Sequence, residues 1–421
     1  MLRRIKINGF KSLVDVELEL PRLVVLAGPN AAGKSNVLDA IQMLARAGTQ
    51  RTLADALDTP IRGYPVEAFT FPAGGLPELL EQPAASFTIE GDLEIPGDEN
   101  AETARARSAA RAIYRVGVEI DPDAGVLSLA DEHLTMAAQN WQPKGHARIE
   151  VVDGRVRVRR SSGSGRPPDE ELHVNHTYLS DTRLSGSQYP LFDSVRGELA
   201  TWRTHYLDPQ AAMRAAVPAR EVFDIGMRGE HLAPFLYGLK MRRPREFAAV
   251  SRTLRTVIPA VTSLDVELDT KRGELDIQIE QDGTTFSSRI ISEGTLRVLA
   301  LCAISVTARR GLIAFEEPEN GVHPQRIDRI AELLTSVARR GGAQIVVTTH
   351  SPGFVAAMLL LSRDEGAHIA LFNVVRDRRE TVIKPFGDPG LWSEPAIDEL
   401  LREPDEYDKV AAVVRRGWLD I

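Results

Sequence analysis

The stretch GPNAAGKS at residues 28–35 decides the fold, because it fits the pattern G-x-x-x-x-G-K-[ST] of a phosphate-binding loop. The apolar run LVVLA at residues 23–27 comes directly before it and predicts a short buried strand. After the loop, apolar residues recur at helical spacing and predict a helix over residues 34–47. A strand, a glycine-rich loop and a helix in this order are typical of a nucleotide site in an α/β protein.

The residue types in this loop suit the binding of phosphates. Gly28 and Gly33 allow the backbone angles that wrap amide groups around phosphate oxygens. The positive end of the following helix faces the β-phosphate. Lys34 neutralises the β- and γ-phosphate oxygens, and the hydroxyl of Ser35 can bind Mg²⁺. The sequence therefore predicts a site for a nucleoside triphosphate with its magnesium ion.

Two carboxylates follow a second apolar run, LIAF at residues 312–315. A carboxylate at the end of a buried strand beside a phosphate loop typically holds Mg²⁺, and a second one can polarise the attacking water. We therefore assign Glu316 to the metal and Glu317 to general-base work. The alternative is a solvated acidic turn after a core strand, which the pairing with a phosphate loop disfavours.

A third buried strand, predicted over residues 343–348, is followed by Thr349 and His350. At that position His350 can contact the γ-phosphate, and the alternative is a purely structural histidine. A helix predicted over residues 293–309 opens with Ser292, which either caps that helix or binds a phosphate at its N-terminus. A second anion-binding helix start suggests a nucleotide held between two subunits.

The chain has 421 residues, a formal net charge of −8 and a single cysteine, Cys302. These values exclude a globally basic surface for nucleic acids and a disulfide framework, and a reducing compartment fits them. The start of the chain lacks the apolar region of a signal peptide, and no apolar stretch is long enough to cross a membrane. We therefore expect a cytoplasmic protein that does not enter a membrane.

The rest of the chain alternates between short strands and helices around a long middle section. Strand–helix alternation at both ends predicts an α/β core whose halves are far apart in sequence, with roughly residues 50–280 inserted between them. Asp153-Gly154 between two alternating runs predicts a hairpin over residues 146–160. The further expected elements are strands 2–8, 14–20, 86–95, 114–120 and 369–374, a charged helix or linker 97–113, a helical stretch 209–260, a hairpin 263–280, and helices 327–340 and 405–416.

Four motifs in order, GPNAAGKSN, ISEGT, FEEPENGVHP and TTHSP, resemble the SMC/RecF/OLD branch of the ABC-type ATPases, that is, AAA family ATPases of the AAA_21 and AAA_15 kind. The opening INGFKS at residues 7–12 is similar to the strand and loop that start these heads. The resemblance implies an α/β fold: an ABC-type P-loop ATPase head with a mixed central sheet, an antiparallel β subdomain and a helical lobe inserted in the middle. The expected regions are 1–50 (head), 51–208 (inserted β-rich region), 209–284 (helical lobe and hairpin) and 285–421 (head).

The resemblance also implies a mechanism in which two heads close face to face around two ATP molecules with Mg²⁺. Glu316 would be the Walker B acid, Glu317 the catalytic base and His350 the switch histidine, while Ser292 and Gly294 would contact the γ-phosphate bound to the opposite subunit. The residues implied to hold the nucleotide are Asn30, Ala31, Ala32, Gly33, Lys34, Ser35, Asn36, Lys11, Ser12, Ser292 and Gly294. The residues implied for catalysis are Glu317, His350 and Lys34, and those implied for the metal are Ser35 and Glu316. Asn320 and Gly321 fall in the D-loop region, and Gln188 is a candidate Q-loop glutamine.

The sequence departs from this branch in several places. The signature reads SEGT in place of SGGQ, and Glu316 stands where many ABC proteins have aspartate. There is no long coiled coil of the SMC kind. Only residues 351–421 follow His350, which is short for the C-terminal nuclease domain of OLD-type enzymes. We therefore expect any nuclease or other effector to be a separate protein.

In this branch such heads often serve DNA repair or defence against phages and plasmids. We therefore expect a homodimer that ATP closes and hydrolysis reopens, acting as a switch with a partner effector. One alternative is an ATP-bound scaffold that hydrolyses slowly and holds or inhibits a partner protein. The motor of a membrane transporter is a third reading, which EEPENGVHP and the large insertion disfavour.

A local basic patch is the candidate contact with DNA. Arg155, Arg157 and Arg159 would share one face of the predicted hairpin, where they can meet phosphates. The alternative is a solvated strand face, or an edge protected against aggregation. Further basic residues are Arg160 and Arg166 nearby, and a second cluster of Lys240, Arg242, Arg243 and Arg245.

Overall fold

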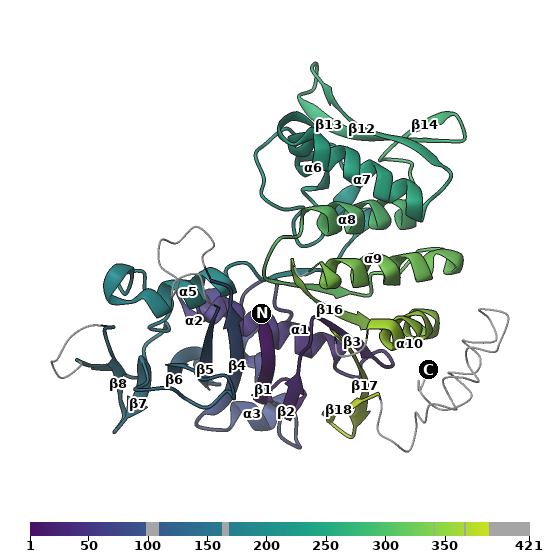
Figure 1. Ribbon diagram of the computed structural model, residues 1–421. Coiled ribbons are helices and arrows are strands. Elements are labelled where there is room, and N and C mark those ends of the chain that lie inside the picture. Colours follow the sequence, from purple (N-terminus) through teal and green to yellow (C-terminus); the bar gives the residue numbers. More distant parts are fainter. Residues whose placement is uncertain (98–108, 162–167, 341, 366–367, 387–421) are drawn as a thin grey trace. The chain divides into compact units, whose positions relative to one another are not determined.

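The structure is a computed structural model that describes residues 1–97, 109–161, 168–340, 342–365 and 368–386 (Figure 1). The helix predicted over residues 405–416 and Arg166 lie outside these ranges. Contacts divide the chain into two compact units. The first unit consists of Met1–Pro21, Ala31–Trp202 and Val374–Ile383, and the second of Arg22–Asn30, Arg203–Asn373 and the chain from Lys384 onward.

An eight-stranded antiparallel sheet forms the frame of the first unit, in the order β2-β1-β4-β5-β6-β7-β8-β9 (Figure 1). Alternating buried and exposed residues along each strand give the sheet one apolar and one polar face. The strands are β1 (Leu2–Phe10), β2 (Leu13–Glu19), β4 (Ala85–Ile95), β5 (Ala110–Asp121), β6 (Val126–Met136), β7 (Ile149–Val152), β8 (Arg155–Val158) and β9 (Asp169–Glu171).

Three helices cover the apolar face of this sheet: α1 (Lys34–Ala47), α2 (Leu53–Leu57) and α5 (Pro190–Leu199). α1 lies close to β4 because Gly91 has no side chain; a Cβ there would be 2.6 Å from the Leu44 side chain. The loop after α2 contains η1 (Pro65–Ala68) and α3 (Leu76–Leu80) and is anchored by an aromatic cluster of Phe10, Phe69 and Phe87. The helix that follows the phosphate-binding loop is therefore packed firmly on the sheet.

A largely parallel sheet in the order β10-β15-β16-β3-β17-β18 forms the frame of the second unit as far as Asn373 in β17. The rest of β17 and most of β18 belong to the first unit. Its strands are β10 (Arg203–His205), β15 (Leu312–Glu316), β16 (Gln344–Thr349), β3 (Leu23–Ala27), β17 (Ile369–Asp377) and β18 (Glu380–Pro385). In register, Glu316 pairs with Thr348, and Thr349 pairs with Ala27. The carboxyl ends of β15, β16 and β3 therefore meet at one edge of the sheet.

A second, smaller sheet in this unit carries the helical stretch. Its strands are β11 (Val217–Pro218), β12 (Val261–Asp269), β13 (Glu274–Gln281) and β14 (Thr284–Ser287). Figure 1 shows α6 and α7 against the β12–β13 hairpin, with α8 and then α9 stacked beyond them, and one apolar core runs through these layers. The helices are α6 (Leu232–Arg242), α7 (Pro244–Val257), α8 (Glu293–Thr307), α9 (Ile327–Arg339) and α10 (Pro352–Glu365), and a short π-helix spans Pro209–Met213.

The structure confirms the expected α/β fold class, and most elements lie where the sequence predicts them. The Asp153-Gly154 turn forms, with φ of 53° and 71°, and so does the hairpin at residues 263–280. Two expectations were incomplete. β5 already begins at Ala110, inside the expected helix or linker, and β6 was not predicted because the charged run 131–133 interrupts its alternation. The four expected regions of the chain stay a prediction.

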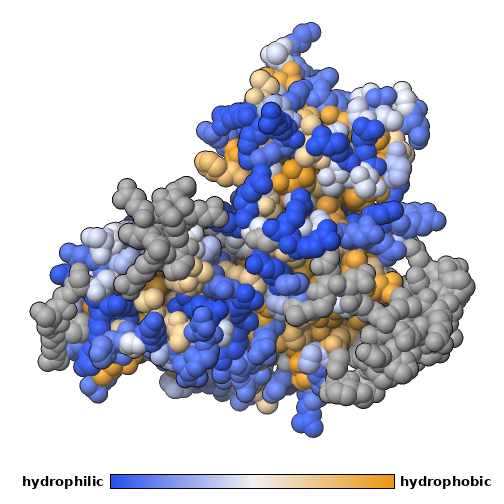
Figure 2. Space-filling model, in the orientation of Figure 1, coloured by the Kyte–Doolittle hydropathy of each residue, from blue (hydrophilic) through white to orange (hydrophobic). Residues whose placement is uncertain are grey.

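The described helices give no sign of a membrane span, since none combines sufficient length with sufficient apolar character. The core of each unit is a packed interior of Leu, Ile, Val, Ala and Phe side chains, while many hydrophilic residues lie on the face seen in Figure 2.

Candidate active site

The phosphate-binding loop leaves β3 at its carboxyl end. Gly28 donates its N–H to the carbonyl of Thr349, 3.2 Å away. Ala31 and Gly33 then adopt positive φ of 64° and 101°, which turns the backbone sharply into α1. Helix α1 starts with no side-chain cap and no acidic residue in its first turn, and its first residue, Lys34, is buried. A helix start without a capping side chain suits phosphate oxygens.

A network of side-chain hydrogen bonds holds this loop in place. Thr381 on β18 donates its hydroxyl to the carbonyl of Ala32 at 3.0 Å and accepts from Ser12 at 2.6 Å. Asn36 in turn donates its side-chain amide to the Ser12 hydroxyl at 2.7 Å. Gly33 must be glycine here, because a Cβ would lie 1.9 Å from the Thr381 hydroxyl oxygen. Thr381 was not among the predicted site residues.

Lys11 and Ser12 lie in the turn between β1 and β2, and both line a pocket beside the loop. The Lys11 ammonium group lies 2.6 Å from Asp39 on α1 and donates to the carbonyl of Arg62 at 2.8 Å. Asp39 is fully buried, so this ion pair fixes the turn to α1. In the structure the charge of Lys11 is thus paired with a carboxylate. Its predicted contact with a nucleotide stays a prediction.

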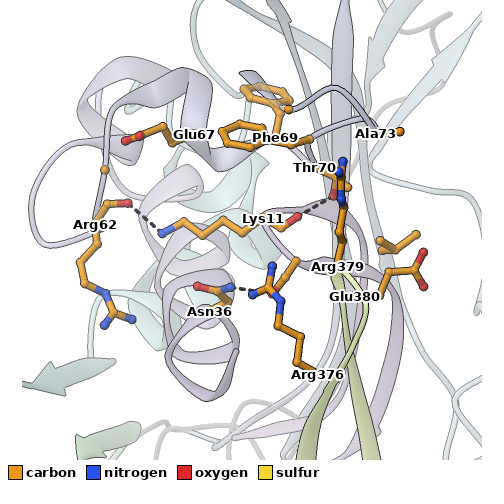
Figure 3. A pocket seen from close by; sticks show the side chains of 15 residues that line it. Lys11, Asn36, Arg62, Glu67, Phe69, Thr70, Ala73, Arg376, Arg379 and Glu380 are labelled. Atoms are coloured by element: carbon orange, nitrogen blue, oxygen red, sulfur yellow. Dashed lines mark hydrogen bonds between the residues drawn. The ribbon is translucent and has the colours of Figure 1, made fainter. Parts of the chain in front are cut away.

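The pocket has a volume of about 710 Å³ (Figure 3). Three stretches distant in sequence form its walls: the β1–β2 turn, the loop 62–75 and the turn between β17 and β18. Figure 3 shows Arg376 and Arg379 of the last turn on the same side of the pocket as Asn36 of α1. Nothing in the sequence indicates that this turn lines a pocket beside the phosphate-binding loop.

At the carboxyl edge of the parallel sheet, Glu317 is held by two neighbours. Its Oε1 lies 2.7 Å from Nδ1 of His350, and its Oε2 accepts the side-chain amide of Asn320 at 2.7 Å. The backbone of Glu317 has a positive φ of 46° and its N–H donates to Thr348. A non-glycine residue rarely takes this conformation, and such positions cluster at functional sites. The sequence predicted Glu317 and His350 separately, and the structure brings them together.

Glu319, for which the sequence predicted no role, is a second carboxyl at this edge. It is 5% exposed, and its Oε1 accepts the hydroxyl of Thr349. Burial raises the pKa of Glu319 to about 7, and the nearby charge of Glu317 acts in the same direction. Burial also lowers the pKa of Arg297 on α8, whose charge interacts with Glu319 and Glu317. The charge of Arg297 on α8 is therefore coupled to the carboxylates in the turn after β15.

At the start of α8, Ser292 and Gly294 each have a structural role. Ser292 is the N-cap of this helix, because its hydroxyl accepts the N–H of Thr295 at 3.2 Å. Gly294 lies against the turn at Gly321, and a Cβ on it would be 2.4 Å from the Gly321 carbonyl oxygen. The capping role of Ser292 is thus confirmed, and the contact of Ser292 and Gly294 with a nucleotide on a second subunit stays a prediction.

The described residues contain no group of three or more histidine, cysteine, aspartate or glutamate side chains placed to hold a metal ion. Mg²⁺ in nucleotide sites takes only one or two protein oxygens and completes its shell with phosphates and water. Ser35 and Glu316 carry oxygen donors of this kind, and their assignment to a magnesium ion stays a prediction. When bound, the ion would neutralise charge on the phosphate oxygens.

The predicted basic patch is mostly paired within the first unit. Arg157 lies 3.0 Å from Asp169, and Arg159 lies 2.6 Å from Glu150. Arg155 is exposed. In the second cluster, Lys240 and Arg243 pair with Asp265 and Glu246 at 2.5 and 3.0 Å, and Arg242 pairs with Glu221. Gln188, the candidate Q-loop residue, is exposed in a short 3₁₀ turn at Gly186–Gln188.

Comparison with known proteins agrees with this geometry. The chain is 22% identical over 413 residues to the OLD nuclease of Thermus scotoductus (strain ATCC 700910 / SA-01), and the match covers 92% of this chain and 64% of that protein's length. The chain thus spans less than two thirds of this relative. Among solved structures, an SMC head bound to the C-winged helix domain of ScpA matches with a TM-score of 0.51 at 14% identity, covering 93% of this chain and 99% of that one. That likeness concerns the fold.

The family assignment rests on a broader match. Residues 23–356 match the AAA_21 family, which is described as "AAA domain, putative AbiEii toxin, Type IV TA system". The matched range includes the phosphate-binding loop, the signature helix, the acidic strand end and His350. This chain therefore belongs to the AAA_21 family and has the P-loop fold of the SMC- and OLD-type ABC ATPases.

Proposed function

We propose that this chain binds ATP with Mg²⁺, hydrolyses it, and uses the ATP-bound state to close two copies face to face. The observation that carries the proposal is the carboxylate of Glu317, fixed between His350 and Asn320 at the carboxyl edge of the parallel sheet. That edge is also where β3 leads into the phosphate-binding loop. Ligands of α/β proteins bind at the carboxyl ends of the strands.

In the proposed reaction, Glu317 accepts the proton of the water that attacks the γ-phosphate. His350 and Asn320 keep its two carboxylate oxygens in a fixed direction, so little reorganisation is needed when the reaction begins. Lys34 would neutralise the β- and γ-phosphate oxygens, and Ser35 and Glu316 would hold the magnesium ion. Ser292 and Gly294 of a second copy contact the same γ-phosphate, which makes closure depend on ATP.

We propose a role in DNA repair or in defence against phages and plasmids, with a nuclease-like protein as the effector. Two findings support this role: the family description names a toxin–antitoxin system, and one relative is named an OLD nuclease. The competing reading is a scaffold that stays bound to ATP and holds a partner. The contact between Glu317 and His350 favours ATP hydrolysis, because a scaffold that only binds ATP does not require a positioned general base.

Light scattering with and without ATP tests the switch. Wild type and Glu317→Gln are compared, since the variant should bind ATP but lack the base. We expect ATP to raise the mass of the variant lastingly, and that of wild type only until the ATP is consumed. If both bind ATP and neither changes mass nor releases phosphate, the scaffold reading is favoured. If neither binds ATP, the nucleotide site itself is wrongly assigned.

A further inference from the structure

The turn between β17 and β18 brings two arginines to the pocket beside the phosphate-binding loop (Figure 3). Arg376, near the end of β17, donates to the carbonyl of Ala31 in that loop at 3.4 Å. Arg379, in the turn just before β18, donates to the carbonyl of Pro72 on another wall at 2.6 Å. Each guanidinium has five N–H donors, so one backbone bond leaves most of its donors for a ligand.

The turn is fixed in this position by buried contacts. The N–H of Thr381 donates to the carbonyl of Ser12 at 2.8 Å, and their hydroxyls are bonded at 2.6 Å. Both side chains are buried, at 5% and 8% exposure. Residues 374–383 accordingly belong to the first unit, together with α1 and the loop from Ala31 onward. The two arginines therefore reach the pocket from a rigid support.

The composition of the pocket suits a flat, weakly polar group next to phosphates. Phe69 and Phe71 give it an aromatic wall, and Val14 adds an aliphatic one. The carboxylate of Glu67 is already bonded to the N–H of Tyr64. A volume of about 710 Å³ lies within the range of roughly 300–1,000 Å³ that is usual for small-molecule sites. Asn36, in the first turn of α1, connects the pocket to the phosphate-binding loop.

We propose that Arg376 and Arg379 bind the nucleoside part of the nucleotide whose phosphates rest on the loop. A guanidinium plane can stack on the face of a base and donate to ribose or base oxygens at the same time. The pocket then takes the base and ribose of a nucleoside triphosphate, with the β17–β18 turn as its third wall. This inference rests on the proposed function and adds a specific group of residues to it.

Binding of two ligands by matched variants tests the proposal. ATP and inorganic triphosphate are titrated calorimetrically into wild type, Arg376→Gln, Arg379→Gln and the double variant. Arg378→Gln is the control, because it removes the same charge from the same turn at an exposed residue that does not line the pocket. Lys34→Ala serves as the reference for loss of phosphate binding. Thermal melting of every variant checks that the fold is kept.

We expect the double variant to bind ATP at least about tenfold more weakly, since each charge-assisted bond contributes substantially to binding. Its affinity for triphosphate should change less than about twofold, and Arg378→Gln should resemble wild type for both ligands. Lys34→Ala should lose both ligands. If the double variant binds ATP as wild type does, or loses ATP and triphosphate alike, this inference is wrong and the proposed function stands. If wild type binds neither ligand, both fall together.

Discussion

Nδ1 of His350 lies 2.7 Å from Oε1 of Glu317, so the residue expected to respond to the γ-phosphate already holds the residue expected to activate water. An ionised carboxylate can only accept, which places the ring proton on Nδ1. In the proposed mechanism Nε2 is therefore the nitrogen that meets the phosphate. The other oxygen of Glu317 is held by Asn320, so the orientation of the carboxylate is fixed from both sides.

Replacing the proposed base should separate binding from turnover. Glu317→Gln keeps the shape of the side chain and its contact with Asn320 or His350 but removes the proton acceptor. We expect phosphate release to fall about 100- to 10,000-fold, the usual contribution of a general base. The affinity for ATP should stay within a fewfold of wild type. Turnover that survives this substitution would show that another group accepts the proton.

The bond between His350 and Glu317 predicts that their substitutions are not additive. His350→Ala alone should lower kcat about 10- to 100-fold with little change in KM, because it frees the carboxylate to rotate. In the Glu317→Gln background the same change should have almost no further effect, since residues that act as a unit lose their function together. Independent, multiplying effects in this double-mutant cycle would mean that His350 acts on the substrate alone.

The hydroxyl of Thr381 should matter more for stability than its size. Thr381→Val keeps the shape but leaves the Ala32 carbonyl without this donor, whereas the Ser12 hydroxyl still accepts from Asn36. Each buried polar group left unpaired costs about 1–3 kcal/mol, so urea unfolding should show a loss in that range. Thr381→Ser retains the hydroxyl and should recover most of the stability. Equal losses for serine and valine would indicate that the methyl group, and not the hydrogen bonds, is what matters.

The sequence alone was sufficient to predict those residues of the candidate site that follow an apolar run of strand length. The phosphate-binding loop, Glu317 and His350 each come directly after an apolar run of strand length, and parallel strands bring such ends to one edge. The register of Glu316 with Thr348 and of Thr349 with Ala27 realises that arrangement. Periodicity therefore predicted these positions without knowledge of the strand order.

The sequence was insufficient where contact depends on pairing across the chain. Thr381 is 369 residues from Ser12, and nothing in its neighbourhood indicates a partner. Arg376 and Arg379 stand in a charged turn that reads as an ordinary hairpin end. β6 was missed because Glu132 occupies a buried strand position, where backbone N–H groups compensate its polarity. Alternation cannot reveal a buried polar residue whose partners come from another segment.

The arginine face of the β7–β8 hairpin should contribute little to nucleic-acid binding. Arg157 and Arg159 are engaged by Asp169 and Glu150, so binding a phosphate would require breaking these pairs. We expect replacement of Arg155, Arg157 and Arg159 by glutamine to lower the slope of log affinity for duplex DNA against log salt concentration by about 0.9, which corresponds to one lost phosphate contact. A reduction corresponding to three contacts would show that the ion pairs open on DNA and that all three arginines take part.

The carboxyl group of Glu132 predicts a pH dependence of stability in the first unit. It is fully buried and accepts the N–H groups of Tyr178 and Leu179 at 2.7 and 2.9 Å. Burial raises its pKa from 4.5 to about 7, although these hydrogen bonds act in the opposite direction. The folded state therefore binds a proton that the unfolded chain has lost. The stabilising effect is complete below about pH 4.5 and is lost as the pH rises through about 7.

Glu132→Gln removes this titration and places the new side-chain NH₂ group opposite the backbone N–H of Tyr178 or Leu179. We expect the variant to be less stable than wild type by about 1–3 kcal/mol at low pH, because one amide loses its acceptor. The advantage of wild type should then shrink by on the order of 1 kcal/mol per pH unit between about pH 4.5 and about pH 7. Urea unfolding of both proteins across this range measures the difference directly. A difference that stays constant, or that grows with pH, would show that Glu132 is ionised in the folded protein throughout.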